Sequence, residues 1–169
     1  MHSLKVLVLE NSPFQLMAMH QVLNACGVFD VLTAEDVPHA CRSLDKRGGV
    51  DIAFCDVQAA GSSSMELIRH LGATGLARAL VLYSSAGPQA MANAVALAEQ
   101  QGLPVLDALT KPATSSVVHP LLEGFLGSPD SGCTLPLPEV QDLGCLDGAL
   151  FGQLRELCAR TQVQPGKMP

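Results

Sequence analysis

Polar residues follow three short apolar segments of the sequence, and together their side chains could support chemistry. Glu10 and Asn11 follow the run LKVLVL, and Asp56 follows DIAFC. Lys111 comes two residues after LPVLDAL. Each run is typical of a β-strand, and the carboxyl ends of parallel strands meet at one edge of a sheet, where open α/β folds build their sites. We therefore expect these side chains to converge. A carboxylate there is a competent nucleophile towards a phosphoryl group if neighbouring groups balance its charge.

Apolar runs alternate with helix-like segments from Leu4 to about Leu126, a pattern that indicates a parallel sheet covered on both faces. The first helix has clear ends: Ser12 suits the N-cap, Pro13 the first helical position and Gly27 the carboxyl-terminal stop. The pattern predicts five strand–helix units. The expected strands are 4–9, 28–33, 51–55, 79–83 and 103–109, and the expected helices are 13–26, 37–47, 65–71, 88–101 and 115–126.

The composition changes at Gly127 and divides the chain into three parts. Residues 1–126 are predicted to form the α/β domain. Residues 127–145 contain a stretch with three Pro and two Gly and no periodicity, which predicts a linker. Residues 146–169 are predicted to form a C-terminal helix and tail, because apolar residues recur at helical spacing between Leu146 and Ala159. That helix could pack on the main domain, pair with a second copy or begin an output module.

Composition and charge exclude several classes of protein. The formal net charge is -6 and no run of Lys or Arg occurs, so we expect no nucleic-acid partner. No segment has the roughly 18 apolar residues needed to cross a bilayer, and the N-terminus lacks the pattern of a signal peptide, so we expect no membrane partner. The six Cys have no CxxC spacing, which predicts reduced thiols in a cytoplasmic protein. The five His lack the spacing of metal ligands.

The pattern of polar residues resembles the receiver domain of two-component response regulators. The resemblance spans residues 4 to about 126, and the matching positions occur in the family's order and at its spacing. It implies a flavodoxin-like fold, with a five-stranded parallel sheet in the order 2-1-3-4-5 and five helices. The matching positions are the pair Glu10 and Asn11, the acceptor Asp56, the pair Ser85 and Ala86, and Lys111 followed by Pro112.

The resemblance also implies a magnesium site. Receivers hold Mg²⁺ with the acceptor aspartate, an acid of the first pair and a main-chain carbonyl two residues after the aspartate, which are the oxygen ligands this ion prefers. Carried over, the metal ligands are Asp56, Glu10, Asn11 and the carbonyl of Gln58. Asn11 stands where the family usually has an Asp, so weaker Mg²⁺ binding is expected. Glu10 is one methylene longer than the usual Asp and could reach further into the pocket.

By the same resemblance Asp56 is the expected phosphoacceptor, and Lys111 and Ser85 are the other reacting groups. Lys111 would pair with Asp56 and later with the phosphoryl oxygens, a role that suits a compact ammonium. Ser85 would hydrogen-bond the phosphoryl group. The donor would be a histidine kinase or a phosphotransfer protein. Helices 88–101 and 115–126 would form the responding face, which commonly supports a homodimer. The domain would be a signalling module and not an enzyme.

Two further positions depart from the family pattern. The aromatic residue that receivers usually carry three residues before the lysine is Ala108 here, and Tyr83 in the preceding strand is not an evident replacement. The alignment at the switch hydroxyl could also shift by one residue, from Ser85 to Ser84. The usual coupling between a moving aromatic ring and the hydroxyl is therefore unsupported by the sequence.

Other functions stay open beside this one. The opening VLVLENSPFQ and the segment ALTKP resemble receivers fused to EAL-type cyclic di-GMP phosphodiesterases, which would make this chain the sensory part of a longer regulator. A degenerate pseudo-receiver that acts through phosphorylation-independent protein contacts is favoured by Asn11, whereas Asp56 and Lys111 speak against it. A small flavodoxin-like binding protein is disfavoured, because the segment ENSPFQ is not a phosphate-binding loop rich in Ser, Thr and Gly.

Overall fold

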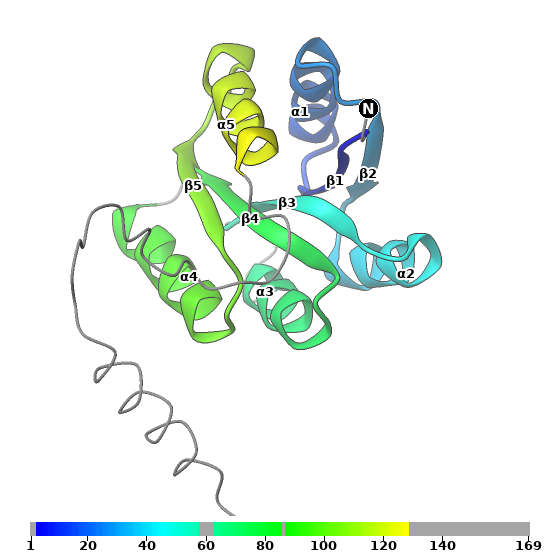
Figure 1. Ribbon diagram of the computed structural model, residues 1–169. Coiled ribbons are helices and arrows are strands. Elements are labelled where there is room, and N and C mark those ends of the chain that lie inside the picture. The colour runs from blue at the N-terminus through cyan, green and yellow to red at the C-terminus, as the bar shows by residue number, and fades with distance from the viewer. Residues whose placement is uncertain (1–2, 58–62, 86, 129–169) are drawn as a thin grey trace, which may run out of the picture. The chain divides into compact units, whose positions relative to one another are not determined.

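The computed structural model describes residues 3–57, 63–85 and 87–128 of the chain. Within them five parallel strands form one sheet in the order β2-β1-β3-β4-β5, and a helix follows each strand (Figure 1). The predicted fold class and strand order are confirmed. The strands are β1 (Lys5–Leu9), β2 (Asp30–Ala34), β3 (Val50–Asp56), β4 (Ala77–Ser84) and β5 (Val105–Thr110), and the helices are α1 (Pro13–Ala25), α2 (Val37–Arg47), α3 (Ser63–Thr74), α4 (Pro88–Gln100) and α5 (Ser115–Gly127).

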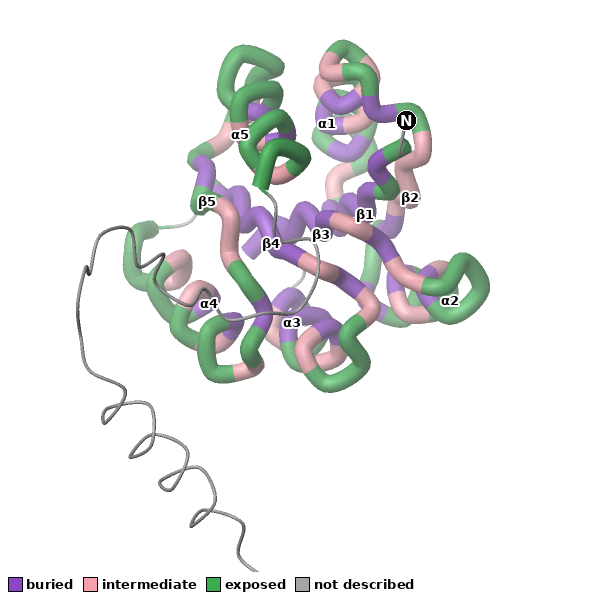
Figure 2. The backbone as a smooth tube through the Cα atoms, viewed as in Figure 1, coloured by how far each residue is buried: buried purple, intermediate pink, exposed green. Residues whose placement is uncertain are grey.

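Each face of the sheet carries its own apolar core, because successive side chains of a strand point to opposite faces. Helices α1 and α5 cover one face, and α2, α3 and α4 cover the other (Figure 1). In β1, Leu7 and Leu9 belong to the core under α2, α3 and α4, whereas Val6 and Val8 belong to the core under α1 and α5. Figure 2 shows the central strands as almost continuously buried. Such burial is typical of a parallel sheet covered on both sides.

Helix α2 has the boundaries that the sequence predicts, because both of its ends carry strong local signals. The Asp36 side chain accepts a hydrogen bond from the His39 N–H at 2.6 Å and so caps the first turn. Gly48 ends the helix with a φ of 81°, a left-handed conformation that suits glycine. Lys46 and Arg47 lie in the last turn, where their charge complements the helix dipole.

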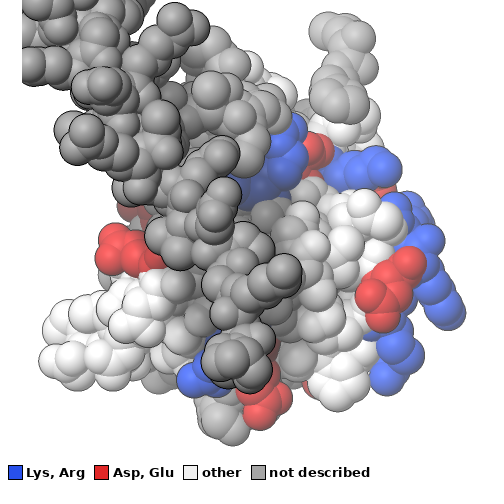
Figure 3. Space-filling view, turned by 60° about the horizontal axis from the view of Figure 1, so that its bottom comes forward, with Lys and Arg blue, Asp and Glu red and all other residues white. Residues whose placement is uncertain are grey.

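Figure 3 shows basic side chains gathered at one side of the face it draws, with acidic ones among them.

Strands β3 and β4 extend further than their apolar runs predict. The ladder between them continues into polar residues, and its last pair is Asp56 with Tyr83. Asp56 is therefore the final residue of its strand and not the first residue beyond it. Helix α3 is also longer than the predicted 65–71, beginning at Ser63 and ending at Thr74. An apolar pattern does not include polar residues, which explains the extensions to Asp56 in β3, to Ser84 in β4 and to Ser63 and Thr74 in α3.

Strands β2 and β5 each begin two residues later than predicted. The apolar residues at their predicted starts close the preceding helices instead. The Val28 N–H bonds to the Leu23 carbonyl at 3.0 Å, and the Leu103 N–H bonds to the Ala98 carbonyl at 2.9 Å. Val28 and Leu103 are both buried, so an apolar residue that ends a helix gives the same sequence signal as the start of a strand.

The remaining predictions concern the chain's organisation. The predicted linker 127–145 and the C-terminal helix and tail 146–169 lie outside the described residues, apart from Gly127, the last residue of α5, and Ser128. No helix within the described ranges is long and apolar enough to span a bilayer. The three described cysteines, Cys26, Cys41 and Cys55, are free thiols.

Gly72 in α3 permits a close contact and provides a test of packing. A methyl group there would overlap the Cβ of Gln101, which caps α4, and would lie 3.1 Å from the Gln101 carbonyl oxygen. We expect Gly72→Ala to lower the free energy of unfolding by about 1–3 kcal/mol, as overpacking does. Urea unfolding would measure this as a lower midpoint at unchanged slope.

Gly124→Ala in α5 is the matched control. A methyl group at Gly124 meets no atom within 4 Å. Since alanine favours a helix interior over glycine, this variant should gain about 0.5–1 kcal/mol. Equal stability of the two variants would contradict the close approach of α3 to the end of α4.

Candidate functional site

The carboxyl ends of β1, β3 and β5 bring three charged side chains together. Glu10 directly follows β1, Asp56 ends β3, and Lys111 directly follows β5. Both acids are buried, with Glu10 1% and Asp56 2% exposed. Strand β4 lies between β3 and β5, so the Lys111 side chain extends across its end to reach the acids. The structure thus places these three predicted residues in one small cluster.

The Lys111 ammonium is the centre of this cluster. Its Nζ lies 2.8 Å from Asp56 Oδ2 and forms a second ion pair with Glu10 Oε2. A third acceptor, Gln15 Oε1, comes from α1 at 2.6 Å. An ammonium has three N–H donors, so every donor has an acceptor. Two buried carboxylates without a cation would be strongly unfavourable. The amine compensates one of the two formal charges, and one net negative charge is left.

Glu10 is held through both its main chain and its side chain. Its N–H bonds to the Ala34 carbonyl at the end of β2 at 3.0 Å. Its Oε1 accepts the Ser12 N–H at 3.0 Å, in the turn that leads into α1, and its Oε2 pairs with Lys111. Both oxygens of this predicted metal ligand therefore already have donors from the protein.

The other two predicted metal ligands are not among the buried residues of the cluster. Asn11 is exposed beside Glu10, and Gln58 lies outside the described residues. In the described part of the chain, no group of three or more His, Cys, Asp or Glu side chains could hold a metal ion. Glu10 and Asp56 are hard oxygen donors of the kind that Mg²⁺ takes. The donor set therefore fits this ion in chemical type, while the number of ligands depends on Asn11 and Gln58.

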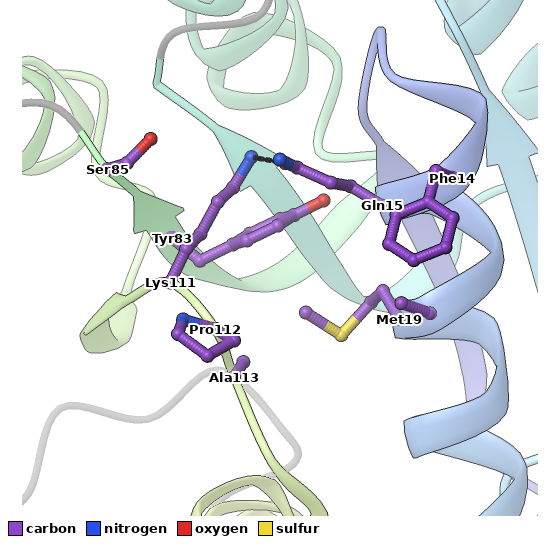
Figure 4. A pocket seen from close by; sticks show the side chains of 9 residues that line it. Phe14, Gln15, Met19, Tyr83, Ser85, Lys111, Pro112 and Ala113 are labelled. Atoms are coloured by element: carbon purple, nitrogen blue, oxygen red, sulfur yellow. Dashed lines mark hydrogen bonds between the residues drawn. The ribbon is translucent and has the colours of Figure 1, made fainter.

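The two candidate switch hydroxyls occupy different environments. Ser84 is the buried last residue of β4, and its carbonyl accepts the Lys111 N–H at 3.1 Å. Ser85 follows the strand, is exposed and lines the same cavity as the Lys111 side chain (Figure 4). Of the two, Ser85 has the position from which a hydroxyl could meet a group bound in that cavity.

Tyr83 belongs to the cluster, whereas the sequence analysis named it only as an aromatic that is not an evident replacement for the one absent at Ala108. It pairs with Asp56 in the β3–β4 ladder and is 2% exposed. Lys111 Nζ lies 4.8 Å from its ring centroid, and its hydroxyl donates to the Leu9 carbonyl at 3.4 Å. Burial, followed by the negative charges of Glu10 and Asp56, raises the pKa of Tyr83 well above its usual value. Its hydroxyl therefore stays protonated. Only the register between two strands reveals this position, and the sequence alone does not give that register.

A cavity of about 330 Å³ lies next to the cluster, between α1 and the segment that follows β5. Figure 4 shows Tyr83 and Lys111 on one side of it and Phe14 and Met19 on the other. The hydrogen bond from the Lys111 amine to Gln15 is drawn there as a dashed line. The lining residues are Phe14, Gln15, Ala18, Met19, Tyr83, Ser85, Lys111, Pro112 and Ala113. An apolar wall thus adjoins the charged groups.

Cys55 precedes Asp56 but takes no part in the cluster. Its side chain is fully buried in the core on the opposite face of the sheet. Burial, followed by the charge of Asp56, raises the pKa of the Cys55 thiol to about 12. The thiol is therefore protonated at neutral pH and acts as a small apolar core residue.

Comparison with known proteins identifies a relative of the chain. The sequence matches no family model. Over 125 residues it is 33% identical to the cyclic di-GMP phosphodiesterase RocR of Pseudomonas aeruginosa. The match covers 74% of this chain and 32% of that protein, so the chain spans about a third of the relative's length.

Solved structures share the architecture over most of the chain. A response regulator from Colwellia psychrerythraea has a TM-score of 0.61 at 21% identity, and the match covers 74% of this chain and 98% of that one. A response regulator receiver domain protein from Clostridium thermocellum has a TM-score of 0.60 at 22% identity, covering 73% and 94%. The chain therefore has the fold of response regulator receiver domains, the family that its sequence resembles.

Proposed function

We propose that this chain is the phosphoacceptor receiver domain of a cytoplasmic two-component response regulator. In this proposal Asp56 accepts a phosphoryl group from a histidine kinase or a phosphotransfer protein. The ion pair of 2.8 Å between Lys111 and Asp56, at the carboxyl edge of the sheet, is the observation that supports it most directly. The amine balances the charge of the nucleophile and lies where the oxygens of an incoming phosphoryl group would come.

The proposed reaction moves one phosphoryl group between two nucleophiles. An Asp56 oxygen forms a bond to phosphorus while the phosphorus–nitrogen bond of the phosphohistidine breaks. The imidazole nitrogen keeps the bonding electron pair, and the product is an acyl phosphate. Such transfers depend on positioning and on neutralising the phosphoryl oxygens. Lys111 would neutralise part of that charge, and Ser85 at the cavity would donate a hydrogen bond to one oxygen.

Mg²⁺ would neutralise the rest of the charge in this proposal. The residues that would hold it are Asp56, Glu10, Asn11 and the carbonyl of Gln58. Glu10 already accepts from Lys111 and the Ser12 N–H, and Asn11 carries no charge. The site should therefore bind Mg²⁺ more weakly than one that has a second acid in place of Asn11.

We also propose that the chain is the receiver part of a longer regulator. Its relative of about three times the matched length is a cyclic di-GMP phosphodiesterase, which agrees with a downstream EAL-type output domain. The responding face would be formed by α4, β5 and α5, where a homodimer could form. Neither α4 nor α5 contains Lys or Arg, whereas α4 exposes the small residues Ala92 and Ala96. Contacts there would rest on close apolar packing and not on salt bridges.

A phosphorylation-independent pseudo-receiver is the second candidate. One observation favours it, since the Lys111 amine already has Glu10, Asp56 and Gln15 as acceptors and the cluster is saturated without a phosphoryl group. Such a module would act through constant protein contacts. The response to an acyl-phosphate mimic separates the two candidates.

Beryllofluoride with Mg²⁺ mimics the acyl phosphate and provides this test. We expect saturable shifts of the amide resonances of Asp56, Ser85 and Lys111, because the mimic would rearrange the amine and the hydroxyl. Asp56→Asn should abolish the shifts, since it removes the carboxylate that binds the mimic. Asp45→Asn, which removes an exposed acid from α2, is the matched control and should retain them. If the amide resonances of the wild-type chain do not shift with beryllofluoride at millimolar Mg²⁺, the pseudo-receiver is favoured.

A second test concerns the neutral residue of the predicted metal site. Asn11→Asp adds a negative charge where the family has its acid, and at about 4 Å the attraction to a divalent ion is large before repulsion between acids offsets it. We expect Mg²⁺ to bind about tenfold more tightly, measured by titration of amide resonances. Asn93→Asp places the same charge on the exposed surface of α4 and should leave the affinity unchanged. Equal affinities of the two variants would exclude position 11 from the metal site.

A further inference from the structure

Tyr83 is the single tyrosine of a chain that has no tryptophan, and it lies inside the charged cluster. Its strand, β4, runs between β3 and β5, the strands that supply Asp56 and lead to Lys111. The side chain packs in the core under α1 and α5, with Phe54 edge-on at 6.4 Å between ring centroids. The ring therefore has a fixed place at the base of the cluster.

Two contacts connect this side chain to the site. Lys111 Nζ lies 4.8 Å from the ring centroid, and the Lys111 side chain is only 12% exposed. A cation over an aromatic face is attracted to it, and more strongly where water is excluded. The hydroxyl lies at the carboxyl end of β1, where it donates to the Leu9 carbonyl at 3.4 Å, and the negative charge of the next residue, Glu10, helps to raise its pKa. One side chain thus contacts the Lys111 amine and the main chain of the residue that precedes Glu10.

We propose that Tyr83 is a positioning residue, whose ring supports the Lys111 ammonium and whose hydroxyl fixes that ring to the Leu9 carbonyl, so that the amine stays between Glu10 and Asp56. The role of Tyr83 in phosphoryl transfer rests on the function proposed above, whereas its role in placing the amine does not. Tyr83 belongs to β4, and the place in β5 where receivers usually carry an aromatic is the exposed Ala108. The aromatic contact to this site therefore comes from the core and not from the surface.

The hydroxyl distinguishes this role from simple core packing. Phe54, on the neighbouring strand, shows that a phenyl ring fills the same core. A buried hydroxyl is unfavourable unless it is hydrogen-bonded, and the Leu9 carbonyl accepts that bond here. A tyrosine that only filled space would therefore be replaced by phenylalanine without effect on Glu10 or Lys111.

The first arm of the test needs no phosphorylation, because all tyrosine emission of the chain comes from Tyr83. A carboxylate close to the phenol quenches that emission. We expect Glu10→Gln to raise the emission and Lys111→Met to change both emission and near-ultraviolet circular dichroism. Arg78→Met is the matched control, because Arg78 lies over the Phe125 ring at 5.3 Å, away from the cluster. Emission that stays at the wild-type value in both cluster variants would overturn the proposal.

The second arm measures phosphorylation by acetyl phosphate at saturating Mg²⁺. Tyr83→Phe should lower the maximal rate by up to about tenfold, because the ring loses the hydrogen bond that fixes it under the amine, with the half-saturating donor concentration unchanged. Adding Tyr83→Phe to Lys111→Met should cause no further loss, since the ring acts only by placing the Lys111 amine. Leu44→Ala, in the core on the other face of the sheet, controls for lost stability and should leave the rate of the folded protein unchanged.

The hydroxyl would have a structural role only if the rate losses of the two single variants multiply in the double variant. The same conclusion would follow if Tyr83→Phe were phosphorylated at the wild-type rate. The two proposals fail separately. A wild-type chain that acetyl phosphate does not modify would refute the proposed function, and the emission of Glu10→Gln and Lys111→Met would still decide whether Tyr83 contacts the ion pair.

Discussion

Glu10 and Asp56 are almost inaccessible to water, and two carboxylates in that position repel each other and lose their hydration. The Lys111 ammonium offsets both effects by pairing with both acids. Its strand, β5, is separated from β3 by β4, and β1 lies beyond β3. Four adjacent strands must therefore be in register before the charges can meet. The site depends on the completed sheet, and the buried acids in turn require the lysine.

Much of the fold could be predicted from the sequence, because the relevant signals are local or belong to a family pattern. Helix α2 has its predicted ends, since Asp36 caps one end and Gly48 stops the other. The order of the strands followed from the resemblance of spaced motifs to receiver domains, and the structure has that order. Element ends formed by polar residues, such as Asp56 in β3, differ from the predicted bounds because an apolar pattern does not include polar residues.

The site was predictable in its charged members and not in its supporting ones. Glu10, Asp56 and Lys111 are all identified by their places after apolar runs. Tyr83 and Gln15 join the cluster through the pairing of β3 with β4 and through the packing of α1 on the sheet, both of which are tertiary. The C-terminal prediction lies outside the described residues and stays a prediction.

The main chain of Lys111 has a consequence of its own. Its N–H bonds to the Ser84 carbonyl at the end of β4 at 3.1 Å, while its amine binds the two acids. Ser84 begins the short segment that leads to Pro88, the first residue of α4. Lys111 therefore connects the buried acids, through its side chain, to the end of the strand that precedes α4, through its main chain. Any change in the partners of the amine thus acts on a residue whose main chain is anchored to β4.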